Sequence, residues 1–121
     1  MMTPRRRFSA DDTAGRAFEE RVRGAVATLL ADRARNPGVQ RVADRLATSV
    51  RTLQRRLHAS GVTYAEVLQE QRCAAARRLL TDRTQAIADV ARTLGYSDPA
   101  HFTRAFQRWT GSSPSAFRRG R

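Results

Sequence analysis

Apolar residues recur every three or four positions along most of this chain, which is the spacing of one face of an α-helix. The first such stripe predicts a helix over about residues 14–34. Its apolar members are Phe18, Val22, Val26, Leu29 and Leu30. A longer stripe predicts a second helix over about residues 63–81, and Thr63 with Glu66 three positions later is typical of a capping box. No segment alternates apolar and polar residues over a useful length, so the pattern predicts an all-α protein.

The most informative feature is an internal repeat. The matching positions are Val39, Val42, Ala43, Leu46 and Ser49 in one copy and Ile87, Val90, Ala91, Leu94 and Ser97 in the other. Further along, Leu53 and Leu57 correspond to Phe102 and Phe106, which indicates one extra residue in the second turn. Each copy predicts a short helix, a tight turn and a longer second helix. The chain is therefore expected to contain two helix-turn-helix subdomains.

These patterns divide the chain into a tail and one domain. Residues 1–13 lack periodicity and are expected to form a mobile basic tail. The remainder, residues 14–121, is expected to be one double helix-turn-helix domain. Within it, the first unit covers about residues 37–61, a long central linker helix about residues 63–81, and the second unit about residues 84–111.

Charge adds a functional indication to this organisation. The 121 residues include 23 basic side chains, all of them arginine, against 11 acidic ones, which gives a formal net charge of +12. A charge of this size destabilises a small domain by self-repulsion and indicates a polyanionic partner. Nucleic acid is the leading candidate and an anionic membrane surface is the second.

Other classes of site have little support. The single cysteine, Cys73, excludes an intramolecular disulfide and a thiolate-rich zinc site, and we expect it to be a small core residue in a protein of the reducing cytoplasm. His58 and His101 have no acidic or cysteine partner at ligand spacing, so no metal and no cofactor are expected. Neither a membrane span nor a secretory signal is visible, and we expect no membrane partner.

The second helix of each copy carries the candidate binding residues. In the first copy the outward positions are Arg51, Gln54, Arg55 and His58. Arginine can bind guanine bidentately in the major groove, and glutamine can bind adenine in the same way. In the second copy they are Pro99, Ala100, His101, Thr103, Arg104 and Gln107, which offer fewer donors. Five arginines and one aspartate give residues 37–61 a charge of +4, whereas three arginines and two aspartates give residues 84–111 only +1.

The stretch from residue 39 to residue 119 resembles the AraC/XylS-type DNA-binding domain. The motifs that carry the resemblance are Ile87-Ala88-Asp89-Val90-Ala91, Leu94-Gly95-Tyr96-Ser97-Asp98, Arg104-Ala105-Phe106, Trp109, Gly111 and Ser113-Pro114. The resemblance implies about seven helices, with two helix-turn-helix units joined by a long helix, and a bacterial transcription regulator that acts as an activator. It also implies partners: double-stranded DNA, and RNA polymerase.

The resemblance also implies a set of contact residues. Those expected at base edges are Arg51, Gln54, Arg55, Pro99, Ala100, His101 and Arg104. Those expected at phosphates are Ser49, Thr52, Ser97, Thr103, Gln107 and Arg108. Arg72, on the linker helix, could contact a phosphate or pair inside the protein, and the sequence leaves both readings open.

Three alternatives remain at this point. The family usually adds an amino-terminal effector or dimerisation domain, for which 121 residues leave no room, so the chain is either part of a longer regulator or a single-domain member. An arginine-rich RNA-binding or ribosome-associated module would use the same charge without groove geometry. An enzyme is the weakest reading, because the alkyl-transferring relatives of the family depend on several cysteines, and we expect no catalytic activity.

Overall fold

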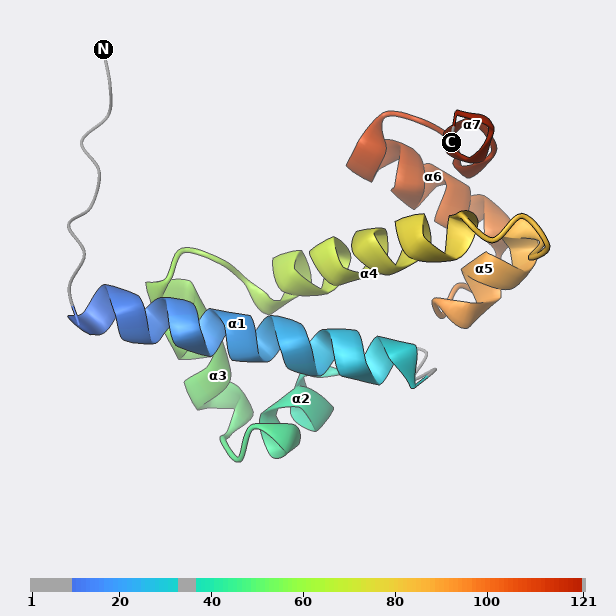
Figure 1. Ribbon diagram of the computed structural model, residues 1–121. Coiled ribbons are helices and arrows are strands. Elements are labelled where there is room, and N and C mark those ends of the chain that lie inside the picture. The colour runs from blue at the N-terminus through green and yellow to red at the C-terminus, as the bar shows by residue number, and fades with distance from the viewer. Residues whose placement is uncertain (1–9, 33–36, 121) are drawn as a thin grey trace, which may run out of the picture.

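The computed structural model describes residues 10–32 and 37–120 and confirms the all-α fold for this part of the chain. Its seven helices are α1 (Ala10–Ala31), α2 (Val39–Arg45), α3 (Val50–Ala59), α4 (Tyr64–Leu80), α5 (Ile87–Thr93), α6 (Pro99–Thr110) and α7 (Pro114–Arg119). Helix α4 runs alongside α1, α2 and α3 also pack against α1, and α5, α6 and α7 gather at the end of α4 (Figure 1).

The first helix differs from its predicted bounds. Helix α1 begins at Ala10, so residues 10–13, which we expected to be tail, are helical, and it ends at Ala31 rather than near residue 34. An apolar stripe records only where a helix is buried, and backbone hydrogen bonds can extend the helix beyond that contact. The remainder of the expected tail, residues 1–9, lies outside the described part of the chain.

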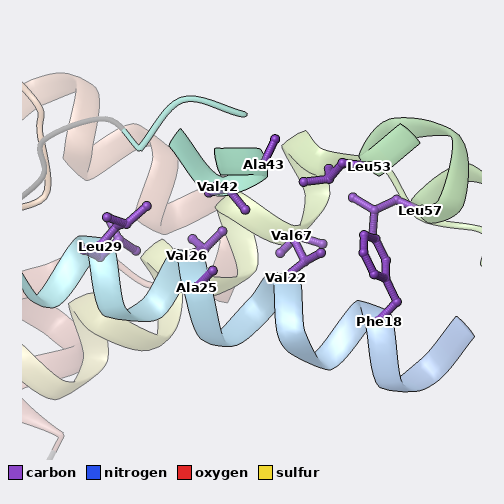
Figure 2. Close-up of a cluster of buried hydrophobic side chains, with 11 residues drawn as sticks. Phe18, Val22, Ala25, Val26, Leu29, Val42, Ala43, Leu53, Leu57 and Val67 are labelled. Carbon is purple, nitrogen blue, oxygen red and sulfur yellow. The ribbon is translucent and has the colours of Figure 1, made fainter. Parts of the chain in front are cut away.

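A first hydrophobic cluster joins α1 to the α2–α3 unit. Its buried members are Phe18, Val22, Ala25, Val26, Leu29, Leu30, Val42, Ala43, Leu53, Leu57 and Val67. Figure 2 shows the α1 side chains of this cluster directed toward α2, α3 and the first half of α4. The apolar stripe read from the sequence is therefore the core face of α1, and α1 completes the core of the first helix-turn-helix unit.

A second cluster builds the other unit around the end of α4. Its buried members are Ala75, Ala76, Leu80, Val90, Ala91, Leu94, Phe102 and Phe106. Phe106 is central to it, with ring centroids 5.8 Å from Phe102, 6.4 Å from Trp109 and 5.5 Å from Phe117. Trp109 is only partly buried and lies at the edge of this cluster. Helix α4 contributes to both clusters and so links the two units.

Both ends of α4 are capped. At its start, the Thr63 hydroxyl accepts a hydrogen bond from the Glu66 amide, while the Glu66 carboxylate accepts one from the Thr63 amide, which confirms the predicted capping box. At its end, the Arg118 guanidinium donates to the carbonyl oxygens of Leu80 at 3.0 Å and Asp82 at 3.2 Å. These two carbonyls would otherwise lack helical partners, so Arg118 ties α7 to the end of α4.

The turn inside each helix-turn-helix unit has the same backbone design. In the first unit the Thr48 amide donates to the Ala43 carbonyl oxygen at 2.9 Å, and the Tyr96 amide repeats this bond to Ala91 at 2.9 Å in the second. This is the six-to-one hydrogen bond of a Schellman motif, which requires a left-handed residue just before the donor. That residue is Ala47, with φ of 57°, in the first turn, and Gly95, with φ of 98°, in the second.

We predict that Ala47→Gly raises the free energy of unfolding by up to about 1 kcal/mol, because a left-handed conformation is strained for a residue with a Cβ atom. Gly95→Ala should lower it by about 1 kcal/mol or more. Gly24→Ala is the matched control, since Gly24 is exposed within α1 with open space around it, and there alanine should stabilise. Urea unfolding checks all three, and a loss of stability in Ala47→Gly would contradict the strain argument.

Candidate nucleic-acid interface

Helix α3 presents the predicted contact residues of the first unit on its outer side. Leu53 and Leu57 are fully buried and fix the inner face of the helix. Residues three or four positions apart share a face, so the remaining positions turn outward. The exposed positions there are Arg51, Gln54, Arg55 and His58, and Thr52 is partly buried.

Ser49 caps the start of α3. Its side chain accepts a hydrogen bond from the Thr52 amide at 3.0 Å, and Ser49 is thereby the N-cap of the helix. The hydroxyl remains exposed and keeps its own proton for donation to an acceptor such as a phosphate oxygen. This cap leaves the first turn of α3 well ordered, with Arg51 on the outer side of that turn.

The outer face of α3 is free of acidic groups. Residues 48–60 contain no aspartate or glutamate. Arg56, which was not among the predicted contacts, faces back to α1, with its guanidinium carbon 3.9 Å from the centre of the Phe18 ring. This contact anchors α3 to α1 by a cation–π interaction and leaves Arg51 and Arg55 as the outward cations of the helix.

Helix α6 presents a different surface. Its N-cap is Asp98, whose carboxylate accepts a hydrogen bond from the Ala100 amide at 2.9 Å. Pro99 occupies the first helical position, where it lacks an amide proton to donate. The Asp98 carboxylate also lies 3.9 Å from the His101 imidazole. A negative charge therefore lies at the start of α6.

The remaining predicted positions of the second unit divide by exposure. Those that are exposed are Ser97, Pro99, Ala100, His101, Arg104, Gln107 and Arg108, and Thr103 is partly buried. Phe102, Ala105 and Phe106 are buried on the inner side. The structure thus brings the outward residues of each copy together on one helix side. Of the predicted base-contacting positions, all three on α3 carry side-chain donors, whereas Pro99 and Ala100 on α6 carry none.

Arg72 is the residue whose role the sequence left open. It is partly buried on α4, with its guanidinium carbon 5.5 Å from the centre of the Tyr96 ring in the second turn. The structure therefore places Arg72 against a turn of the second unit. The repeat could not have indicated this contact, because the position of Tyr96 in the first copy is Thr48.

Cys73 differs from the expectation of a core position. It is partly exposed and lines an open groove of about 420 Å³ between α4 and the end of α6, together with Glu70, Arg77 and Trp109. The apolar spacing along α4 was a poor guide here, because α4 is shared by two cores and its middle is covered by neither. Within residues 10–32 and 37–120, no three histidine, cysteine or acidic side chains cluster as a metal site would require.

None of the helices in the described part of the chain combines the length and the apolar character needed to cross a bilayer.

Comparison with known protein families gives a match over most of this architecture. Residues 42–120 match a family profile described as a helix-turn-helix domain. This range begins within α2 and ends just after α7, so it contains both predicted contact helices. Helix α1 lies outside the matched range although it completes the first core.

Individual relatives agree with this match. The ornithine utilization regulator of Pseudomonas aeruginosa is 39% identical over 82 residues, covering 68% of this chain and 24% of that protein. The transcriptional activator RhaS of Escherichia fergusonii is 38% identical over 81 residues, covering 66% of this chain and 29% of that protein. The chain thus spans about a quarter of the length of the curated relatives it matches.

A solved structure supports the same comparison in three dimensions. The DNA-binding domain of AdpA, a global transcriptional factor solved in complex with a target DNA, superposes with a TM-score of 0.66 at 31% identity. The alignment covers 82% of this chain and 90% of that domain. The similarity therefore extends over nearly the whole of a domain that was solved in complex with a target DNA.

Proposed function

Because this chain belongs to the AraC-type helix-turn-helix family of transcription regulators, we propose that it binds double-stranded DNA sequence-specifically and regulates transcription. The observation that carries the proposal is the outer side of α3, where exposed Arg51, Gln54 and Arg55 stand over a fully buried inner face. These side chains are the donors that bidentate recognition of guanine and adenine requires. None of the comparisons favours the alternative of an RNA-binding module.

We propose that α3 and α6 enter two adjacent segments of the major groove. Helix α4, which joins the two units, has 17 residues and so a length of about 26 Å. Recognition helices on either side of such a linker can be spaced near the roughly 34 Å of one duplex turn. The base contacts would come from Arg51, Gln54, Arg55, Pro99, Ala100, His101 and Arg104. The phosphate contacts would come from Ser49, Thr52, Ser97, Thr103, Gln107 and Arg108.

We propose a separate role in DNA binding for each segment of the domain. The first unit, about residues 37–61, supplies the stronger readout, the linker helix holds the units apart, and the second unit, about residues 84–111, supplies the weaker one. The arginine-rich residues 1–9 lie outside the described part of the chain. Any contact they make with DNA would be added to this interface.

The proposed setting is transcription in the bacterial cytoplasm. RNA polymerase is the expected protein partner of an activator of this type, and the protein would associate with the nucleoid when bound to DNA. An amino-terminal effector or dimerisation domain in the longer regulator would be consistent with relatives three to four times the length of the matched region. We propose that the protein has no catalytic role.

The unequal outer surfaces of α3 and α6 lead to a prediction about sequence preference. Arg55→Ala should weaken binding to a selected duplex by about 1 to 3 kcal/mol and relax the preference at one base position, because a bidentate contact is lost. Gln54→Ala should act similarly at a neighbouring position. Arg104→Ala should have a smaller effect, since Pro99 and Ala100 leave α6 with few donors to fix its register.

Selection of binding sites from random duplexes at fixed salt tests this asymmetry directly. The selected sites should have one well-defined half and one loose half, about 10 to 10.5 base pairs apart. Equal information in both halves, or a larger loss from Arg104→Ala than from Arg55→Ala, would reject the asymmetry. A single-stranded RNA that outcompetes every duplex would reject the proposed function itself.

A further inference from the structure

Helix α4 carries two polar contacts, one to each helix-turn-helix unit. Near its start, the Tyr64 hydroxyl donates a hydrogen bond to the carbonyl oxygen of Pro37, just before α2. Eight residues later, the Arg72 guanidinium lies against the Tyr96 ring in the turn between α5 and α6. Positions eight apart belong to one side of a helix, so a single side of α4 holds both units.

Tyr64 is partly buried at the start of α4. Burial raises the pKa of Tyr64 to about 12, while the positive charge of Arg72 acts in the opposite direction. The phenol therefore remains protonated at neutral pH and can donate to Pro37. The contact of α4 with the first unit is thus the hydrogen bond from Tyr64, and a contact with the second unit is the Arg72–Tyr96 pair.

Tyr96 connects this contact to the second recognition helix. Its amide donates the hydrogen bond that closes the turn to Ala91, and its ring centroid lies 5.5 Å from that of Phe102 on the buried side of α6. A displacement of Tyr96 would therefore displace α6. The first unit has Thr48 at this position, which offers no ring to a cation, so the contact is particular to the second unit.

Apart from the hydrogen bonds that Arg118 donates to the carbonyl oxygens of Leu80 and Asp82, the other contacts between α4 and the second unit are apolar. Ala75, Ala76 and Leu80 of α4 pack against α5 and α6 in the second cluster. Burial of apolar surface is non-directional and holds helices together without fixing their rotation. A guanidinium over an aromatic ring requires a defined position, so it restricts how the second unit can turn about α4.

We propose that Arg72 is a positioning residue: through Tyr96 it sets the placement of α6 relative to α3, and so determines how strictly the protein discriminates between DNA sites of different spacing. This inference rests on the proposed DNA-binding function for its biological meaning. Its structural part, the fixed placement of one unit relative to the other, holds without DNA.

The DNA test compares duplexes that differ only in the separation of the two contact segments. The probes are a selected site, the same site with one or two base pairs inserted between its halves, and a duplex with the first half alone. Arg72→Ala should lose about threefold to tenfold in affinity for the selected site, the range a cation–π contact supplies. Its affinity for the other two probes should stay near that of the unaltered protein. The spacing penalty, which is the ratio of the affinity for the selected site to the affinity for the site with inserted base pairs, should therefore decrease.

Matched variants separate position from charge. Arg78→Ala removes the same charge from an exposed position of α4 and should leave the spacing penalty unchanged. Tyr96→Phe keeps the ring and should behave like the unaltered protein, whereas Tyr96→Leu should behave like Arg72→Ala. The double variant with Arg72→Ala and Tyr96→Leu should lose little more than either single one, as expected of one shared contact.

A second measurement needs no DNA. Spin labels attached through His58→Cys on α3 and Gln107→Cys on α6, both exposed positions, in a Cys73→Ser background, report the distance between the recognition helices by pulsed electron paramagnetic resonance. Arg72→Ala should broaden or shift this distance distribution, and Arg78→Ala should not.

The outcomes of the two measurements are distinguishable. An unchanged distance distribution together with an unchanged spacing penalty would overturn the inference. Equal weakening on all three duplexes would also overturn it and would indicate that Arg72 contacts a phosphate. A changed distribution in a protein that binds no duplex would support the positioning role and reject the proposed function instead.

Discussion

Raising the salt concentration from about 50 to about 200 mM should weaken duplex binding by a factor on the order of 10³, if about six phosphates are neutralised at the interface. The physical cause is the release of counterions from DNA, which each arginine–phosphate contact drives and which added salt opposes. The formal charge of +12 and the acid-free outer side of α3 supply the cations for this effect. A fluorescence anisotropy titration of a labelled duplex at several salt concentrations gives the slope.

One variant and one control make the salt prediction specific. Arg108→Gln removes an exposed cation from the last turn of α6 and should reduce the log–log slope by about 0.9, the value of one phosphate contact. Arg21→Gln removes an equal charge from the exposed side of α1 and should leave the slope unchanged. Helix α1 packs against the inner face of α3, so Arg21 lies away from the proposed interface. An affinity that is flat with salt would remove the electrostatic part of the proposal.

Phe106→Ala should lower the free energy of unfolding of the second unit by about 3 to 5 kcal/mol, the cost of a large cavity in a packed core. Phe106 is fully buried, and its ring contacts Phe102, Trp109 and Phe117. Trp109 is the only tryptophan in the chain, so its fluorescence reports the unfolding of this unit in urea. Circular dichroism reports the helices of both units together.

Two comparisons accompany the Phe106 variant. Trp109→Ala should cost less, because Trp109 is partly exposed and its indole Nε1 is buried with no hydrogen-bond partner among the described residues. Phe106→Leu keeps most of the apolar volume and should also cost less than Phe106→Ala. If Phe106→Ala unfolds at the same urea concentration as the unaltered protein yet loses DNA binding, the aromatic ring is a contact residue and its assignment to the core is wrong.

The sequence was sufficient for the helices and for the repeated units. Apolar spacing specifies which face of a helix is buried, and this correctly identified Phe18, Val22 and Val26 on α1 as well as Leu53 and Leu57 on α3. The one-residue difference between the copies also appears in the structure, as a turn one residue longer before α6 than before α3. These features are local, because a side chain's position on a helix follows from its place in the sequence.

Apolar spacing could not predict the start of α1, nor the exposure of Cys73 and Trp109. A helix that is partly buried by two neighbours has no single apolar stripe, and α4 is such a helix. Its periodicity therefore predicted a buried Cys73, which the structure places at the groove between the cores. The contact residues on α3 and α6 stay a prediction from outward position and from family resemblance.

The amino-acid sequence by itself determined the fold class, the two helix-turn-helix units, the capping box at the start of α4 and the excess of arginine on the first unit. Each of these follows from neighbours along the chain or from composition. Only the tertiary structure decided that α1 completes the first core, that Arg118 caps the end of α4 and that Arg72 meets Tyr96. Those contacts join residues far apart in the chain, and their partners are chosen by how the helices pack, which no local pattern encodes.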